Sequence, residues 1–274
     1  MTQPDAPARD IQAATPALSL RNISLSFGGV KALDNIDFDV YPHEIVALVG
    51  ENAAGKSTLA KVIAGVHRPS AGTIWSNGAP VTIGSPVAAA RLGIAIVFQE
   101  LALANNLDVT ANMFLGRELI KGSFLQGDQM ESIAQTVLDQ IGARIPSIRY
   151  PVANLSAGQR QSVAIARALL GTPRIVVLDE PTSSLSITQT SEVLDLIVRL
   201  RDLGYAIVLI SHNLADVQAV ADRVVVMRHG RIVGQSPMSH VTYEDIVAAI
   251  TGATHSLPAP PVTRASRVVG TSGQ

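Results

Sequence analysis

The first part of the chain alternates apolar and polar residues over two short stretches. In LSLRNISLSF the apolar Leu18 and Leu20 lie two positions apart, and in NIDFDV the residues Ile36, Phe38 and Val40 recur with the same period. Successive side chains of a strand point to opposite faces, so this period puts the apolar residues on one face. The pattern is typical of half-buried antiparallel strands, and we expect an N-terminal antiparallel β subdomain.

Four later segments are unbroken apolar runs: EIVALVG, GIAIVFQ, RIVVLDE and AIVLISH. Runs of this length that are rich in Val and Ile are typical of strands covered on both faces, as in a parallel sheet. Helical patterns lie between them, and the expected helices include residues 57–66, 128–141, 156–170, 187–203 and 213–221. Strands that alternate with helices predict an α/β fold with right-handed crossovers.

One interval between two of these runs is unusually long. From Gln99 to Arg174 about 75 residues have a mostly helical pattern. This is too long for a single crossover, so we interpret about residues 100–172 as an inserted helical lobe. The expected organisation is a flexible arm at 1–16, an α/β domain at 17–255 that contains the lobe, and a flexible tail at 256–274.

The composition narrows the classes of function. The 274 residues are 47% hydrophobic and 16% charged, which fits a globular protein with much buried sheet. The net charge of −1 gives no general attraction to nucleic acid or anionic lipid. The lack of cysteine excludes disulfides, thiolate metal sites and cysteine nucleophiles. No apolar run approaches the roughly 18 residues that span a bilayer, and the N-terminus does not have the pattern of a secretory signal.

A phosphate-binding pattern follows the first apolar run. Four residues fill G-x-x-x-x-G-K-[ST] between the strand EIVALV and the helical segment STLAKVIAGV, which is the context that the motif requires. Backbone N–H groups of such a loop bind phosphate, while Lys56 would reach the β- and γ-phosphates and Ser57 would ligate Mg²⁺. The expected nucleotide-binding residues are Gly50, Glu51, Asn52, Ala53, Ala54, Gly55, Lys56, Ser57 and Thr58. A chance glycine-rich turn is the alternative.

Two carboxylates, Asp179 and Glu180, end the run IVVLDE. They are expected at the C-terminal edge of the sheet, where open α/β folds bind ligands. With a phosphate loop upstream, Asp179 is expected to hold Mg²⁺ directly or through water, and Glu180 to polarise the water that attacks the γ-phosphate. Helix capping or simple solvation is the alternative for such a pair alone.

The segment NLSAGQRQSVAIARALL, residues 154–170, predicts an amphipathic helix with Ser156 as its N-cap. The free N–H groups and the positive dipole end of this helix would then face solvent. This segment by itself leaves open the alternative of an ordinary capped helix without a further role.

Taken together, the motifs resemble an ATPase subunit of an ABC transporter. GENAAGKST, QE at 99–100, LSAGQRQ, VVLDEPTSSL and LISHNL occur in the order of that family across residues 20–235. SPVAAARLGIAIVFQELAL, LDVTANMFLGRE and YPVANLSAGQRQSVAIARAL resemble the ATPases of bacterial monosaccharide importers, and the single ATPase half resembles their single-domain branch. The resemblance implies an ABC ATPase fold: a P-loop NTPase core with a mostly parallel sheet, an N-terminal antiparallel β subdomain and an inserted helical lobe.

The resemblance also implies roles for further residues. Phe27 matches the aromatic residue that stacks on adenine, with a core phenylalanine at a strand end as the alternative. Gln99 matches a catalytic residue that links the Mg²⁺ and water site to the permease-contacting lobe, and His212 matches the histidine that contacts the γ-phosphate. The signature motif, which binds the γ-phosphate held by the other subunit, matches Ser156, Ala157, Gly158 and Gln159. The site would form in a head-to-tail homodimer with two ATP molecules at its interface.

The sequence departs from the family pattern at several positions. Ala157 replaces the first glycine of the usual LSGGQ signature, Ser186 stands where many members have Asp, and His43 replaces a glycine before EIVALVG. Ala53 and Ala54 occupy loop positions that are often glycine. Alanine costs about 1–2 kcal/mol where φ is left-handed and little elsewhere, and it keeps the backbone N–H groups, so these two alanines remove no chemistry.

These expectations favour ATP hydrolysis coupled to import of a solute, with a monosaccharide implied by the resemblance. The partners would be polytopic permease subunits and, indirectly, a periplasmic or extracellular solute-binding protein, with no nucleic acid, at the cytoplasmic face of the inner membrane. One alternative is a soluble ABC protein that acts on nucleic acid or the ribosome, although such proteins usually have paired ATPase domains or long coiled-coil insertions. A regulatory protein that binds ATP without hydrolysis is another, and a P-loop kinase would leave LSAGQ and LISH without a role.

Overall fold

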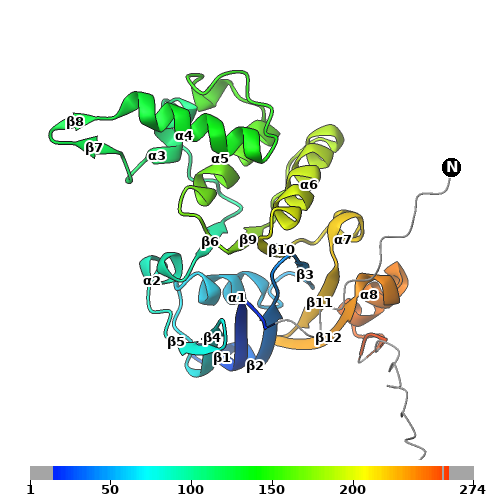
Figure 1. Ribbon diagram of the computed structural model, residues 1–274. Coiled ribbons are helices and arrows are strands. Elements are labelled where there is room, and N and C mark those ends of the chain that lie inside the picture. The colour runs from blue at the N-terminus through cyan, green and yellow to red at the C-terminus, as the bar shows by residue number, and fades with distance from the viewer. Residues whose placement is uncertain (1–14, 255, 259–274) are drawn as a thin grey trace, which may run out of the picture.

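The structure is a computed structural model that describes residues 15–254 and 256–258 (Figure 1). The arm expected at 1–16 and the tail expected at 256–274 lie almost wholly outside these residues. The described chain forms a larger sheet, a smaller sheet, a short hairpin and helices. None of the helices in this part of the chain has both the length and the hydrophobicity to cross a membrane.

The larger sheet has the strand order β12-β11-β3-β10-β9-β6, and its neighbours from β11 to β6 pair in parallel. The four apolar runs form β3, β6, β9 and β10, which confirms the predicted parallel sheet. Strands β11 and β12 pair antiparallel and were not predicted, because RVVVMR has only four apolar residues between two arginines. The strands are β3 Ile45–Val49, β6 Ile94–Val97, β9 Ile175–Asp179, β10 Ala206–Ile210, β11 Arg223–Arg228 and β12 Arg231–Pro237.

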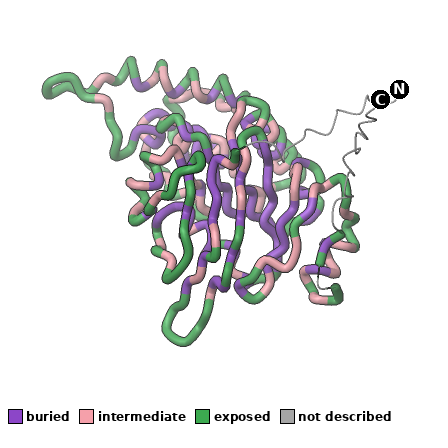
Figure 2. The backbone as a smooth tube through the Cα atoms, turned by 60° about the horizontal axis from the view of Figure 1, so that its bottom comes forward, coloured by how far each residue is buried: buried purple, intermediate pink, exposed green. Residues whose placement is uncertain are grey.

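The central strands are buried on both faces because their residues alternate between two hydrophobic cores (Figure 2). In β10, Val208 and Ile210 face the core shared with the smaller sheet and α1 (Lys56–Ile63). Ile207 and Leu209 face the core shared with α5 and α6. This explains why the strands lack the polar alternation of a half-exposed sheet.

The smaller sheet is antiparallel, with the order β2-β1-β4-β5. Strands β1 and β2 pair with Leu20 opposite Phe38, and the apolar residues of the predicted alternation are all buried. The alternation therefore gave the correct strand type and the correct buried face. The strands are β1 Leu18–Phe27, β2 Val30–Val40, β4 Ala71–Ser76 and β5 Ala79–Val81.

The chain between β6 and β9 forms a helical lobe, which lies on one side of the larger sheet (Figure 1). It is less continuously helical than the pattern predicts, because loops and the β7–β8 hairpin interrupt it. Its elements are α3 Val109–Phe114, β7 Ile120–Lys121, β8 Phe124–Leu125, α4 Gly127–Gln140, a 3-10 turn Val152–Asn154 and α5 Ala157–Leu169.

The other helices are α2 Pro86–Arg91, α6 Ile187–Asp202, α7 Leu214–Val220 and α8 Tyr243–Thr251, with a 3-10 turn Met238–His240. Helix α3 lies in the interval predicted to be mostly helical, whereas α2 and α8 lie outside the helical segments named from the pattern.

Candidate nucleotide-binding site

The loop between β3 and α1 requires glycine at both ends of its motif. Gly50 has φ 151°, and a Cβ there would lie 2.2 Å from the carbonyl oxygen of Met227 in β11. Gly55 has φ 105°, and a Cβ there would lie 2.8 Å from the carbonyl oxygen of Ala32 in β2. Gly55 is also the N-cap of α1 and has no side chain to bind the first N–H groups of the helix. These donors are therefore left to bind an anion, as in other phosphate loops.

The two alanines of the loop have different environments. Ala53 is exposed and has φ 65°, in the left-handed region, whereas Ala54 is buried and is not in that region. The N–H of Ala54 donates to the carbonyl of Glu51 at 3.2 Å, and its carbonyl accepts from the N–H of Gly230 at 3.0 Å. Only Ala53 thus has the backbone for which glycine is the preferred residue.

Lys56 is the first residue of α1, and its ammonium contacts the backbone of the loop that precedes the helix. Its Nζ donates to the carbonyl oxygens of Gly50 at 2.7 Å and Glu51 at 2.9 Å. Burial lowers the pKa of the Lys56 ammonium, and the nearby charges of Glu180 and Asp179 partly oppose this shift. The two carbonyl contacts hold the ammonium beside Gly50 and Glu51 of the phosphate loop, where it can neutralise phosphate oxygens.

Asp179 ends β9 close to the start of α1. Burial and the charge of Glu180 raise the pKa of its carboxyl, while a hydrogen bond with Ser57 lowers it in part. Its Oδ1 is buried and has no hydrogen-bond partner among the described residues. An acceptor that is buried and left unsatisfied indicates a site for an ion or water.

Asp179 and Ser57 fit a Mg²⁺ site that is completed by water and substrate phosphates, rather than a metal site formed by protein ligands alone. Within residues 15–254 and 256–258, no group of three or more His, Cys, Asp or Glu residues has the arrangement of a metal site. Magnesium usually takes one or two carboxylates and completes its octahedron with waters and substrate phosphates. One buried carboxylate, Asp179, beside the hydroxyl of Ser57 has this donor chemistry.

Glu180 and His212 form a side-chain pair at the same edge of the sheet. The Oε2 of Glu180 lies 2.7 Å from the Nδ1 of His212, and the backbone N–H of Glu180 donates to the carbonyl of Ile210 at 2.9 Å. Glu180 is largely buried, whereas the His212 side chain is 65% exposed. Glu180 has φ 52°, a left-handed backbone that a non-glycine residue adopts at a cost and that clusters at functional sites.

Gln99 follows β6 and reaches the loop after Glu180. Its Nε2 lies 3.5 Å from the Oγ of Ser183, whose hydroxyl donates to the carbonyl of Glu180 at 2.9 Å. Gln99 and Glu180 line a pocket of about 400 Å³ together with Ala157 and Arg160 of α5. The structure therefore brings the predicted glutamine, the predicted base and the start of the signature helix to one cavity.

Ser156 is the N-cap of α5, as predicted. The N–H of Gln159 donates to the Ser156 hydroxyl at 3.2 Å, and the N–H of Ser156 donates to the Gln159 side chain at 3.0 Å. Ala157 is the first helical residue, so its backbone does not require glycine. A Cβ at Gly158 would lie 3.1 Å from the Cβ of Gln189 in α6, which explains the small residue there.

The remaining departures from the family pattern have local explanations. His43 has φ 57°, which is the backbone that favours glycine at this position. Ser186 caps α6, and its side chain accepts from the N–H of Gln189 as an Asp side chain would.

Phe27 ends β1, is 48% exposed and meets the ring of His67 edge-on at 5.1 Å between centroids. The alternative of a core phenylalanine is therefore wrong.

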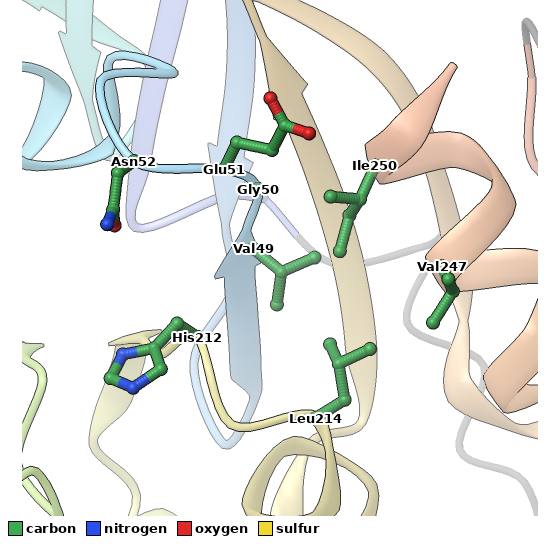
Figure 3. A pocket seen from close by; sticks show the side chains of 8 residues that line it. All are labelled: Val49, Gly50, Glu51, Asn52, His212, Leu214, Val247 and Ile250. Atoms are coloured by element: carbon green, nitrogen blue, oxygen red, sulfur yellow. The ribbon is translucent and has the colours of Figure 1, made fainter. Parts of the chain in front are cut away.

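A second pocket of about 400 Å³ lies beside the phosphate loop (Figure 3). Glu51, Asn52 and His212 line it from the loops, and Val49, Leu214, Val247 and Ile250 complete it from β3, α7 and α8. The contribution of α8 is not among the residues expected from the sequence. The apolar spacing in YEDIVAAIT was the available signal for this helix.

A parallel sheet with a phosphate loop after β3 and a carboxylate pair after β9 defines the chain as a P-loop nucleotide-binding protein. Residues 33–183 match the family profile described as ABC transporter. The chain belongs to this family.

Similar proteins agree with this assignment. The chain is 44% identical to the ribose import ATP-binding protein RbsA 2 of Escherichia coli O157:H7 over 87% of the chain and 47% of that protein. It is 42% identical to the fructose import ATP-binding protein FrcA of Rhizobium meliloti over 88% of the chain and 96% of that protein. The chain thus spans about half the length of the ribose relative and nearly all of the fructose relative. The structure of cbiO1 from Clostridium perfringens, part of the ABC transporter complex cbiONQ, superposes with a TM-score of 0.74 at 28% identity over 88% of the chain and 96% of that structure.

Proposed function

We propose that the chain hydrolyses ATP as the ATP-binding subunit of an ABC importer. The observation that carries this proposal is the contact of 2.7 Å between Glu180 and His212 at the sheet edge that also holds the phosphate loop. The names of the ribose and fructose relatives support a monosaccharide as the imported solute. The subunit binds polytopic permease subunits at the cytoplasmic face of the membrane, and a periplasmic or extracellular solute-binding protein delivers the sugar to that assembly.

The phosphate loop binds the β- and γ-phosphates of ATP through its backbone N–H groups and Lys56. Ser57, Asp179 and Gln99 would hold Mg²⁺, which neutralises charge on the phosphate oxygens when it is bound. The buried and unpartnered Oδ1 of Asp179 supports this assignment. The exposed ring of Phe27 is placed to stack on an adenine rather than to fill the core.

Glu180 is the general base and His212 its partner in this proposal. The Glu180 carboxylate accepts the proton of the attacking water, and His212 orients that carboxylate and contacts the γ-phosphate. Both residues follow strands of the larger sheet, whose pairing fixes the distance between their loops. Gln99 contacts the same loop through Ser183, so a movement of the lobe reaches the base.

In the active state, two copies of the subunit form a head-to-tail homodimer. Ser156, Ala157, Gly158 and Gln159 are at the N-terminus of α5, where free N–H groups attract the γ-phosphate bound by the partner. The capping box keeps Ser156 and Gln159 in the geometry of a helix start. We assign this ATPase domain to residues 17–255, with the inserted lobe at about 100–172.

The substitution Glu180→Gln tests the function. The amide keeps the size of the side chain but cannot accept the proton, so Mg²⁺-dependent phosphate release is expected to fall by at least about 100-fold. ATP binding, measured as the rise in melting temperature with ATP, is expected to persist. Glu192→Gln makes the same change on an exposed position of α6 and is the matched control.

Two outcomes would contradict the proposal. Turnover by Glu180→Gln equal to that of the unaltered protein would show that Glu180 is not the base. Binding of ATP without turnover by the unaltered protein, even when it is joined to its permease, would instead favour a regulatory ATP-binding protein.

A further inference from the structure

Asp216, a buried carboxylate on α7, lies outside the nucleotide-binding motifs described above. It is 6% exposed, and each of its oxygens accepts one hydrogen bond. Oδ2 accepts from the Thr182 hydroxyl at 2.6 Å, and Oδ1 accepts from the Asn213 side-chain amide at 3.0 Å. A hydrogen bond to an ionised acceptor is stronger than one between neutral groups.

The two donors belong to the two loops that carry the Glu180–His212 pair. Thr182 lies two residues after Glu180, and Asn213 directly follows His212. Asn213 is also fixed at its own backbone, since its N–H donates to the Ser211 hydroxyl at 3.0 Å. Asp216 therefore joins both loops from a buried position behind the pair.

An ordinary helix-start role explains only part of this geometry. Asp216 is in the first turn of α7, where an acidic residue favours the helix dipole. A role confined to the helix requires no donor from another element, yet the shorter of the two bonds comes from Thr182, on the loop after β9. That bond crosses from the loop of β9 to the loop of β10.

Two backbone groups also support the pair: the N–H of Glu180 donates to the carbonyl of Ile210 at 2.9 Å, and the N–H of His212 donates to the Oε2 of Glu180 at 3.4 Å. These bonds leave the side chains themselves free to separate. The His212 side chain is 65% exposed, so its contact with Glu180 competes with water. The backbone of Glu180 is in the left-handed region at φ 52°, a conformation that persists only where the surroundings impose it. A buried carboxylate that loses one of its two donors is costly, so Asp216 opposes any separation of the two loops.

We propose that Asp216 and Thr182 are positioning residues that hold Glu180 and His212 in register for hydrolysis. The inference rests on the proposed function, because register matters only if the pair acts on ATP. Asp216 does not touch the reacting atoms in this role, and it acts through the distance between the two loops.

The test compares Thr182→Val with Thr182→Ser. Valine keeps the shape of threonine but removes the donor to Asp216, and serine keeps the donor. Turnover by Thr182→Val is expected to fall on the order of tenfold, the size expected for one hydrogen bond to a buried charge, while KM for ATP stays near that of the unaltered protein. Thr182→Ser is expected to restore turnover, although both variants change the side chain.

Hydrogen exchange gives a second readout that does not depend on turnover. The amide of Glu180 bonds to the carbonyl of Ile210, and the amide of Ile207 bonds to the carbonyl of Glu44 at the far end of β10. In Thr182→Val the Glu180 amide is expected to exchange faster, while the Ile207 amide keeps its rate. Measuring both amides separates loss of register from general destabilisation.

The outcomes distinguish the two proposals. Unchanged turnover in Thr182→Val, or an equal loss in Thr182→Ser, overturns the positioning role. A uniform rise in exchange at both amides overturns it as well, because it shows global destabilisation. Absence of turnover in the unaltered protein contradicts the proposed function instead, and the exchange rates then still decide whether Asp216 fixes the two loops.

Discussion

Replacing each alanine of the phosphate loop by glycine should have opposite effects on stability. In Ala53→Gly the change removes the Cβ from a left-handed residue with φ 65°. Removing this backbone strain stabilises the folded state by about 1–2 kcal/mol. The greater conformational freedom of glycine in the unfolded chain offsets about 0.4–1 kcal/mol of that gain. The free energy of unfolding should therefore rise by about 0–1.5 kcal/mol.

In Ala54→Gly the same chemical change meets a different environment. Ala54 is 4% exposed and does not have a left-handed backbone, so there is no strain to relieve. Loss of the buried methyl costs about 0.8 kcal/mol, and the freedom of the unfolded chain costs about 0.4–1 kcal/mol more. The free energy of unfolding should fall by about 1–2 kcal/mol.

Urea unfolding of both variants without nucleotide measures the difference. The two neighbours are matched controls for each other, because the same group is removed from the same loop. Their free energies of unfolding should differ by about 2 kcal/mol with equal m-values. A destabilisation of Ala53→Gly as large as that of Ala54→Gly would show that the backbone at Ala53 is not strained, and the assignment of its cost would be wrong.

Two further predictions concern the ligand-binding residues. Asp179→Asn removes a buried charge whose Oδ1 has no partner among the described residues, so the melting temperature in EDTA should rise. The extra rise in melting temperature that Mg²⁺ with ATP gives over ATP alone should disappear. A Mg²⁺ effect equal to that of the unaltered protein would exclude Asp179 from the metal site. Phe27→Ala changes an exposed side chain, so stability should change by less than about 0.5 kcal/mol, but titration calorimetry should find ATP affinity reduced on the order of tenfold. Phe27→Tyr should retain that affinity, and equal affinity in all three proteins would remove Phe27 from the adenine site.

Motifs whose chemistry is local could be predicted from the sequence. The strand, the loop and the helix around Lys56 follow from apolar periodicity and from the spacing of Gly50 and Gly55, and both glycines do have a backbone that other residues avoid. The N-cap at Ser156 was predictable for the same reason, since its partner Gln159 is three residues away. In these cases the interactions that decide the structure lie within a few residues of each other.

Features that depend on distant segments could not be predicted. The sequence does not reveal which loop alanine is strained, because φ depends on the path of the backbone and not on the residue type. Asp216 was missed because an acidic residue in the first turn of a helix is common, and its other partner, Thr182, is on a different strand loop. The exposure of Phe27 at the end of β1 also depends on how the strand meets its surroundings.

The walls of the phosphate loop come from segments far from the motif. The carbonyl of Met227 lies where a side chain of Gly50 would have to go, the carbonyl of Ala32 does the same at Gly55, and the N–H of Gly230 holds the carbonyl of Ala54. A fragment of the chain that ends after α7 would keep every motif residue and lose the two contacts made by β11 and the turn after it. The conformation of the loop therefore depends on more than its own sequence. Grafting the loop into another protein requires the backbone carbonyl that β11 supplies as well as the motif residues.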